Sequence, residues 1–413
     1  MKLFFCITLI AFSHTLFAQN IGIGTANPAF KLDVSGGSIN TDSVYRINGS
    51  TILSAKGNDN TLVGINSGLN NTGIYNSTLG KNSLFSNTTG SSNIAIGRTS
   101  LYSNITGGHN TAVGGSALYR NTIGAYNSAF GGSVLLYNIN GDYNTGVGYG
   151  ALIDNTSGKY NVASGYYSLE ENTAGSGNTG IGVSTLNLTI SSSYNTAIGY
   201  KAGHGFNHGW NNTFLGTESN VTGTGLYNSI AIGATANATA SNQARIGNSS
   251  TTSTGGFTNW TNISDGRFKK NIQEDVKGLD FIMKLKPVTY QLDIQALSKK
   301  LNEHKSDTWN TDMQIAAIEK AKIIQSGFIA QDVETAAKEL GYDFSGVDNP
   351  KNENDFYGLR YAEFVVPLVK AVQEQQQLIY ELKKNNASQK GIIDGLIKRL
   401  EKLEGPVLIL SGR

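Results

Sequence analysis

The sequence predicts a mainly β protein in three parts: a parallel β-solenoid of about eleven 17-residue coils, a small α+β domain and a C-terminal coiled coil. The first observation is a repeat in which Asn and Gly recur at every seventeenth position between residues 57 and 248. The second is charge, which is sparse in residues 57–256 and dense after residue 264. The third is a heptad of apolar residues over residues 365–404.

The 17-residue repeat determines the fold prediction. Each Asn is followed four positions later by Gly, with three small or apolar residues between them. The repeated Asn residues are Asn76, Asn93, Asn110, Asn127, Asn144, Asn161, Asn178, Asn195 and Asn212. We expect each unit to form one coil whose central strand residue points inward and stacks on the next coil. Gly and Asn are expected at turn positions where φ is positive. Coils spaced by about 4.8 Å would make a rod of about 50 Å.

The repeat is irregular at its ends and has small inner residues. Asn60 and Gly64 begin the series one residue short, and the last Gly-to-Gly step, from Gly233 to Gly247, shortens to a 14-residue spacing. The expected inner residues are Ala112, Val113, Ala129 and Ala197. A lone coil would therefore have a thin core, and three chains packed side by side would bury more surface, which favours a trimer.

The N-terminal residues predict export. Residues 1–18 have the features of a secretory signal peptide: Lys2, a mostly apolar stretch and a small residue, Ala18, at the cut. The mature chain is expected to be extracellular or on the cell surface, with no membrane span. Residues 19–56 are expected to form an N-terminal adapter of short strands. Cys6 is the one cysteine and lies in the leader, so no disulfide or thiol site is expected in the mature chain.

Composition limits the choice of partners. The formal net charge of +2 over 413 residues does not predict a nucleic-acid partner. No cofactor or metal is expected, because His204 and His208 are only two ligands and a tetrahedral site needs more. The polar outer face of the repeat leaves a host-surface or glycan ligand as a candidate.

The C-terminal third is expected to contain a linker, a folded domain, a helix and a tail. The linker covers residues 249–263 and carries Phe257 and Trp260, and the domain covers residues 264–364. Helical spacing occurs at residues 280–285, 313–324 and 331–340. The polar stretch 295–310 predicts a solvated helix or an arm. Residues 405–413 form the tail.

The heptad predicts a coiled coil over residues 365–404. Its a positions are Val365, Val372, Ile379, Asn386, Ile393 and Leu400, and its d positions are Leu368, Gln375, Leu382, Gln389, Leu396 and Leu403. Pro367 places the helix start near Leu368, or itself lies in the first turn. Val and Ile at a with Leu at d favour two strands, so the heptad alone leaves dimer and trimer open.

The stretch from Ser264 to Lys269 (SDGRFK) carries the candidate chemistry. A serine hydroxyl becomes a nucleophile when a base removes its proton, and a lysine serves as that base when burial favours its neutral form. Asp265 and Gly266 form a turn dipeptide that would bring Lys269 back toward Ser264. Solvated charge beside a turn is the competing interpretation of the same residues.

Residues 264–272 (SDGRFKKNI) resemble the start of the peptidase S74 family, the intramolecular chaperone domain of phage endosialidase tailspikes. The resemblance continues at residues 285–290 (LKPVTY), 326–333 (SGFIAQDV) and 357–369 (YGLRYAEFVVPLV). It implies a trimerising chaperone that cuts itself off between Ile263 and Ser264, with Ser264 as nucleophile and Lys269 as base. Asp265, Arg267 and Gln331 are candidate supporting residues. The last repeat, from Ser229 to Gly247, resembles the head repeats of trimeric autotransporter adhesins.

Two functions follow from these features. The first is an exported homotrimeric fibre with a self-cleaving serine peptidase at its C-terminus. The second is a non-catalytic trimeric adhesin whose C-terminal domain is a permanent trimerisation foot.

Overall fold

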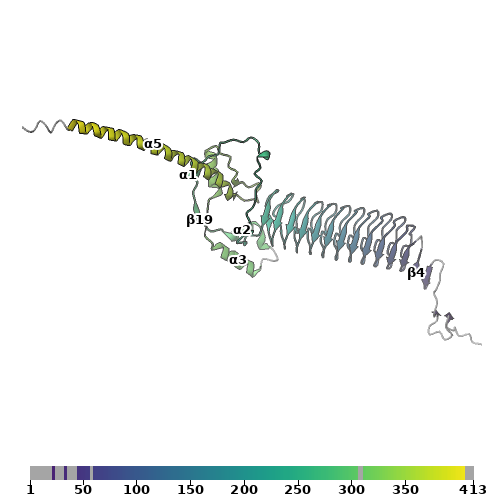
Figure 1. Cartoon of the computed structure of the whole chain (residues 1–413). Helices are drawn as coiled ribbons and strands as arrows, with labels where there is room; N and C mark the ends of the chain where they lie inside the picture. The colour runs from purple at the N-terminus through teal and green to yellow at the C-terminus, as the bar shows by residue number, and fades with distance from the viewer. Residues whose placement is uncertain (1–20, 24–31, 35–43, 56–58, 306–309, 405–413) are drawn as a thin grey trace, which may run out of the picture.

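The computed structural model describes residues 21–23, 32–34, 44–55, 59–305 and 310–404. The predicted signal peptide and the tail 405–413 lie outside these residues, as does most of the adapter. A straight rod of coils occupies one half of the molecule, a small α+β domain covers one end of the rod, and a long helix leaves that domain on the far side (Figure 1).

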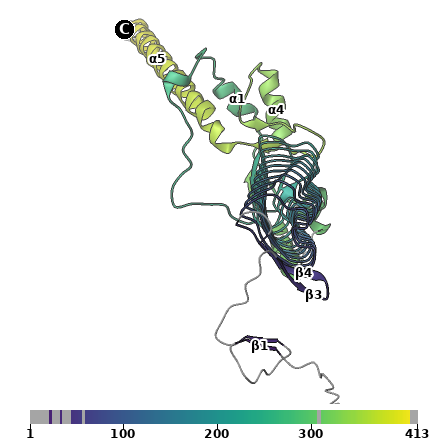
Figure 2. The same ribbon diagram turned by 90° about the vertical axis from the view of Figure 1, so that its right-hand side faces the viewer.

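The rod is the predicted parallel β-solenoid. Two short antiparallel strands, β3 (Val44–Ile47) and β4 (Ser50–Ser54), cover its first coil, and β4 pairs with β5. From β5 onward every pairing in the main sheet is parallel. The strands are β5 (Thr61–Val63), β6 (Ser77–Leu79), β7 (Ile94–Ile96), β8 (Thr111–Val113), β9 (Ser128–Phe130), β10 (Thr145–Val147), β11 (Val162–Ser164), β12 (Thr179–Ile181), β13 (Thr196–Ile198), β14 (Thr213–Leu215), β16 (Ile230–Ile232) and β18 (Ala244–Ile246). Seen along the rod, the coils lie one behind another in a regular stack (Figure 2).

Two small parallel pairs complete the β structure of this half. One is β1 (Ile21–Ile23) with β2 (Leu32–Val34), and the other is β15 (Asn220–Val221) with β17 (Asn237–Ala238). The shortened last repeat is confirmed, because Ile230 of β16 pairs with Ala244 of β18, whereas the preceding coil pairs Thr213 with Ile230 at the longer spacing.

A column of leucines fills the rod, so the expectation of a thin core was wrong. Leu84, Leu101, Leu118, Leu135, Leu152, Leu169 and Leu186 are fully buried and belong to one core cluster. They pack with the central strand residues, such as Ala112 and Ala129, which are buried as predicted. Val113 is not an inner residue, because it follows the buried Ala112 and alternate strand residues point to opposite faces.

The repeated Asn residues are buried hydrogen-bonding groups, and the expectation of a positive φ for them was wrong. The residue before the Asn adopts that conformation instead, as Tyr126 does before Asn127 with φ of 58°. In Asn127 the backbone N–H donates to Asn110 Oδ1 at 3.0 Å, and the side-chain amide donates to the carbonyl of Gly141 at 2.8 Å. The Gly residues after each strand do have positive φ; at Gly114 it is 140°.

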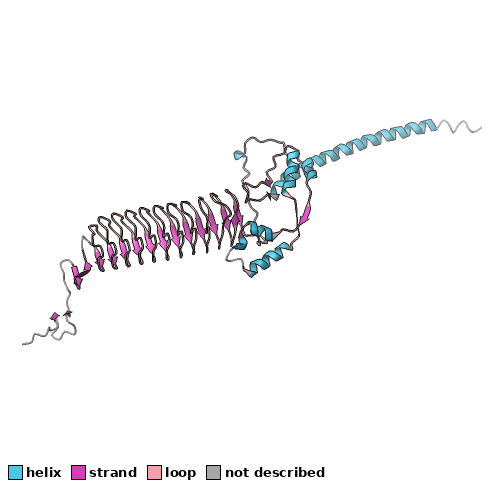
Figure 3. Ribbon diagram, turned by 180° about the vertical axis from the view of Figure 1, so that it is seen from behind, coloured by secondary structure: helices cyan, strands magenta, loops and turns pink. Residues whose placement is uncertain are grey.

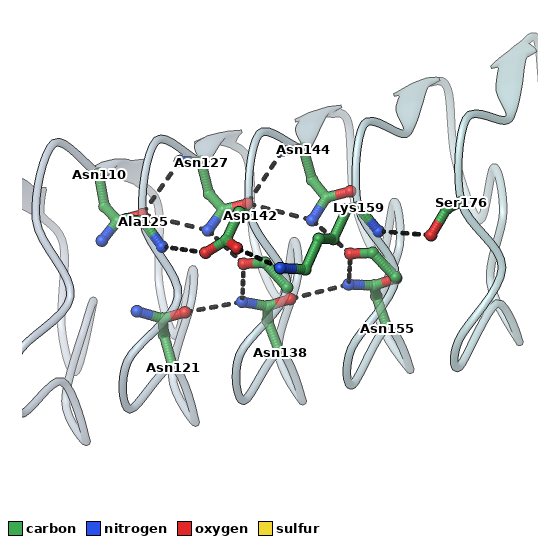
Figure 4. A network of polar contacts seen from close by, with 12 residues as sticks. Asn110, Asn121, Ala125, Asn127, Asn138, Asp142, Asn144, Asn155, Lys159 and Ser176 are labelled. Carbon is green, nitrogen blue, oxygen red and sulfur yellow. Dashed lines mark hydrogen bonds and ion pairs between the residues drawn. The ribbon is translucent and has the colours of Figure 1, made fainter.

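A second Asn column runs parallel to the first. Asn138 Nδ2 donates to Asn121 Oδ1 at 2.7 Å and to the carbonyl of Gly141 at 3.0 Å, so both columns meet on the same glycine oxygen (Figure 4). Every buried amide in these ladders therefore binds the coil before or after it. Such complete satisfaction makes a polar interior tolerable.

The α+β domain has a separate aromatic core. Phe281, Val333, Ala336, Ala337 and Phe344 are its buried members. Its elements are 3-10 turn η1 (Gly266–Phe268), α1 (Leu279–Lys284), β19 (Val288–Tyr290), α2 (Ile294–Lys300), η2 (Glu303–Lys305), α3 (Thr311–Ala321), β20 (Gln325–Gly327), α4 (Ala330–Glu339), β21 (Val347–Asp348), β22 (Gly358–Leu359) and η3 (Tyr361–Phe364). The two strand pairs, β19 with β20 and β21 with β22, are antiparallel. The three predicted helices correspond to α1, α3 and α4.

The last described element is one helix, α5 (Val365–Glu404), that projects away from the domain (Figure 1). Pro367 lies in its first turn, where the missing N–H removes no intrahelical bond. Glu374 Oε2 accepts the backbone N–H of Leu279 at 2.7 Å and so ties α1 to α5. None of the helices in the described ranges has the length and hydropathy that crossing a membrane requires.

Candidate functional site

Ser264 and Lys269 lie in contact at the start of the α+β domain. The Lys269 ammonium nitrogen, Nζ, lies 2.9 Å from Ser264 Oγ. The turn η1 brings them together, because Phe268 N–H donates to the carbonyl of Asp265 and Lys269 N–H to that of Gly266. A hydroxyl and an amine at this distance are within reach for proton transfer.

Asp265 and Arg267 hold the turn that separates the two residues. Asp265 caps η1 by accepting the backbone N–H of Arg267 at 2.9 Å. Its carboxylate also accepts the Arg267 guanidinium, with Nη2 at 2.6 Å from Oδ2. The side-chain bond from Arg267, with its backbone N–H, lowers the pKa of Asp265, and Asp265 raises the pKa of Arg267. Asp265 and Arg267 bind each other and do not bind Ser264, so they stabilise the turn and do not contact the candidate nucleophile.

The loop is open to water in the single chain. Ser264 and Lys269 are exposed, and Ile263 and Phe268 expose 91% and 77% of their surface. The predicted linker covered residues 249–263, but its exposed part begins at residue 252. Ser249 is buried and residues 250–251 are half-buried, because they belong to the joint described below. One chain therefore leaves a row of apolar side chains around the Ser264 peptide bond uncovered.

Gln331 lies elsewhere in the domain. It is the second residue of α4 and lines a cavity of about 760 Å³ with Tyr290, Tyr357 and Tyr361. No residue of 264–272 lines that cavity. The structure thus brings Lys269 to Ser264 and places Asp265 and Arg267 in the turn between them, whereas Gln331 of the described α4 lines a cavity to which none of these residues contributes.

Comparison with known families gave one match. Residues 264–342 match the peptidase S74 family, chaperone of endosialidase. The match starts at Ser264, the first residue of the loop just described. Neither the curated proteins nor the solved structures gave a match. The name S74 domain is used below for residues 264–364, of which the match covers residues 264–342.

The helix that follows the S74 domain carries an uncovered apolar stripe. The apolar a and d residues of the heptad expose between 38% (Ile379) and 70% (Leu403) of their surface. A helix in water gains little from such a stripe unless another helix covers it. The stripe is therefore an uncovered surface of the kind that another helix covers in a coiled coil.

A buried joint connects the S74 domain to the last coils of the solenoid, and sequence reasoning missed it. Glu303 of η2 is only 1% exposed, and its carboxylate accepts the backbone N–H of Ser249 at 3.0 Å and also the Ser249 hydroxyl. Lys320 of α3 donates to the carbonyls of Ser249 at 2.7 Å and Thr251 at 2.6 Å. Burial raises the pKa of Glu303 and lowers that of Lys320. The stretch 295–310 was expected to be a solvated helix or an arm; it does contain the largely exposed end of α2, but Glu303 is buried.

Asp355 forms the second half of this joint. Its Oδ1 accepts the Thr239 hydroxyl at 2.5 Å and the Gln243 amide at 3.2 Å, and Asn352 Nδ2 donates to the carbonyl of Thr239 at 2.9 Å. Burial acts to raise the pKa of Asp355, but these bonds and two backbone N–H groups outweigh it and hold the pKa below its usual value. The S74 domain therefore binds the end of the rod through buried, directional bonds.

Within the described ranges, no group of three or more His, Cys, Asp or Glu side chains is arranged to hold a metal. His208 contacts the hydroxyl of Ser191, at 3.4 Å.

Proposed function

We propose that this chain is an exported trimeric fibre whose S74 domain assembles the trimer and then cuts itself from the fibre between Ile263 and Ser264. The contact of 2.9 Å between Lys269 Nζ and Ser264 Oγ carries the peptidase part of the proposal. The apolar stripe of α5 and the family description support the trimeric assembly.

The proposed reaction begins with Ser264 and the carbonyl carbon of the residue before it. Lys269, as the neutral amine, takes the Oγ proton while Oγ bonds to the Ile263 carbonyl carbon. The C–N bond to Ser264 then breaks, and Lys269 returns the proton to the leaving amine. Water hydrolyses the resulting ester, which leaves a carboxylate on Ile263 and restores the Ser264 hydroxyl. The substrate is the chain itself.

Assembly would control this reaction. Water around an exposed amine favours the charged ammonium, which cannot accept a proton. Three parallel α5 helices would bring three loops together at one end of the coiled coil. The exposed Ile263, Phe268 and Ile272 of neighbouring chains would then exclude water from the Lys269 amine. Cleavage would follow trimer formation and not precede it.

The chaperone role follows from the repeat. Coils that resemble one another can pair in many slipped alignments, and a search among them is slow. A domain that fixes the last coil through Glu303 and Asp355, and that joins three chains through α5, would set the alignment from one end. Removal of the S74 domain and α5 would leave a trimeric fibre that persists because its unfolding is slow.

The test is a denaturing gel and intact mass of the purified full chain. We expect a small fragment whose N-terminal residue is Ser264, and its loss in Ser264→Ala. The N-terminal residue of the large fragment tests export, since cleavage after Ala18 would make it Gln19. Full-length chain as the sole product in a trimer would reject the peptidase and favour the permanent trimerisation foot.

A further inference from the structure

The outward face of the solenoid sheet is apolar from one end of the rod to the other. Each strand points its third residue outward, and in the main-sheet strands from β6 onward ten of these eleven side chains are apolar. They are Leu79, Ile96, Val113, Phe130, Val147, Ile181, Ile198, Leu215, Ile232 and Ile246, with Ser164 as the exception. Most of them are substantially exposed, for example Phe130 at 43% and Ile181 at 42%. We call this column and the first residue of each strand the strand face.

The strand face carries no charge. The first residues of the same strands are small or β-branched: Ser77, Ile94, Thr111, Ser128, Thr145, Val162, Thr179, Thr196, Thr213, Ile230 and Ala244. The strands lie in single file along one side of the rod (Figure 3). Beyond the glycine that ends each strand, Tyr149, Tyr166, Val183 and Tyr200 widen the apolar area in the C-terminal half, each 40–51% exposed.

We propose that the strand face is the surface through which the solenoids of three copies of this chain pack together. The inference rests on the proposed trimer and identifies the part of the rod that forms it. An apolar side chain recurs once per coil, so a partner can interdigitate along the whole length only if its side chains have the same spacing. A second copy of this solenoid has that spacing. The α5 helix would hold the copies parallel and thus in the same alignment.

The size of the strand face suits such an interface. Eleven coils at about 4.8 Å make a strip about 53 Å long, and three extended residues make it about 10 Å wide. The strip covers about 530 Å² per chain, and the stripe of α5 adds to it, against the roughly 800 Å² per partner of a standard stable interface. Its lack of charge matches the depletion of charged residues in interface cores.

A second prominent column of the rod fits this role less well. It consists of the residues before the repeated Asn, where rings stack on one another: His109 on Tyr126 at 4.8 Å, and Tyr143 on Tyr160 at 5.2 Å. Their faces are already covered within the chain. The column is also interrupted at Gly177. The strand face has one break in its apolar third-residue column, at Ser164, and most of that column is substantially exposed.

The test uses two matched positions in one coil. Ile181 on the strand face is 42% exposed, and Ile190, nine positions further round the coil, is 40% exposed. Ile181→Cys and Ile190→Cys are each made in the full chain with Ser264→Ala, to keep α5 attached, and Cys6→Ser. The alkylation rate of each cysteine by a bulky maleimide is measured in the assembled protein and in a chain whose α5 carries Ile379→Lys and Leu382→Lys.

In the assembled protein we expect the cysteine at 181 to react at least about tenfold more slowly than the one at 190, because interface cores exclude water. In the helix variant the two rates should agree. Equal rates in the assembled trimer would overturn the inference and leave the strand face free for another ligand. The self-cleavage test above is scored separately, so failure of the peptidase and failure of the interface are distinguishable.

Discussion

Lys269 reaches Ser264 because a short capped turn reverses the chain between them. Asp265 holds that turn through Arg267, and no element from another part of the domain is needed. The sequence was sufficient to predict this local contact, since turn residues and a Ser-to-Lys spacing of five are visible in it. It could not predict that Gln331 would line a cavity away from Ser264, because the position of Gln331 depends on how α4 packs in the domain.

The first prediction concerns the role of Lys269. Lys269→Gln should slow appearance of the Ser264 fragment by about 10²–10⁴, the usual contribution of a general base. Lys270→Gln is the matched control, because Lys270 is the next residue, carries the same charge and is also exposed. The fragment is quantified on gels over time. Equal slowing in both variants would mean that charge, and not proton transfer, matters.

The second prediction concerns the joint at Glu303. Burial raises its folded-state pKa above the ordinary 4.5, so its contribution to stability is fully present below that pH and is lost as pH rises through the raised value. Asp355 has a lowered pKa, and its contribution is lost only as pH falls below 3.8, outside this window. The Ser249 amide should therefore lose protection against hydrogen exchange as the pH rises from 4.5 toward neutral. In Glu303→Gln, hydrogen exchange at Ser249 should lose this dependence; an unchanged profile would contradict the assignment.

At the scale of single elements, the coil is built from a leucine column and two Asn ladders. The leucines recur with the same 17-residue period as the Asn residues, so the signal was present in the sequence. It was missed because these leucines adopt positive φ, 52° at Leu135, which is rare for a bulky residue. Leucine has a low intrinsic preference for positive φ, so local sequence does not predict this conformation. The burial of each leucine between stacked coils overrides that preference. Glu303 was missed for a related reason: a charged run gives no sign that one member is buried.

The third prediction tests the leucine column. Leu135 is fully buried, so Leu135→Ala should lower the free energy of unfolding by about 2–5 kcal/mol, as lost transfer energy plus a cavity. The neighbouring Leu136 is partly exposed, and Leu136→Ala should cost clearly less. Denaturant unfolding measures both. Equal costs would place the core elsewhere.

The fourth prediction tests the ladder. Asn127→Ala removes the acceptor of the Asn144 N–H, whereas the Gly141 carbonyl keeps its bond from Asn138. The unsatisfied buried N–H should cost about 1–3 kcal/mol. Asn140 is exposed, so Asn140→Ala should change stability by less than about 0.5 kcal/mol. If the two variants unfold alike, the buried amides contribute little to the rod.

At the scale of the whole molecule, one joint connects the rod to the S74 domain, from which α5 projects. An apolar face along the rod and an apolar stripe along α5 are both exposed in the single chain. The sequence predicted the order of these parts, because repeat, charge and heptad each mark one of them. It did not predict the contacts between rod and domain, which depend on pairs as distant as Thr239 with Asp355.

The fifth prediction concerns α5 as the trigger of assembly. Ile379→Lys with Leu382→Lys places charge in the seam and should yield single chains that do not cut themselves. Gln377→Lys with Glu381→Lys adds lysines outside the a and d positions and should preserve both assembly and cleavage. Sedimentation and gel analysis of the same samples report the two properties together.

The most direct measurement is the N-terminal residue and intact mass of the small fragment, followed over time in separated trimer and monomer fractions of the full chain. We predict a fragment that begins with Ser264 and accumulates only in the trimer fraction. A trimer that keeps the bond between Ile263 and Ser264 intact, or monomers that cut at the same rate as trimers, would contradict the account.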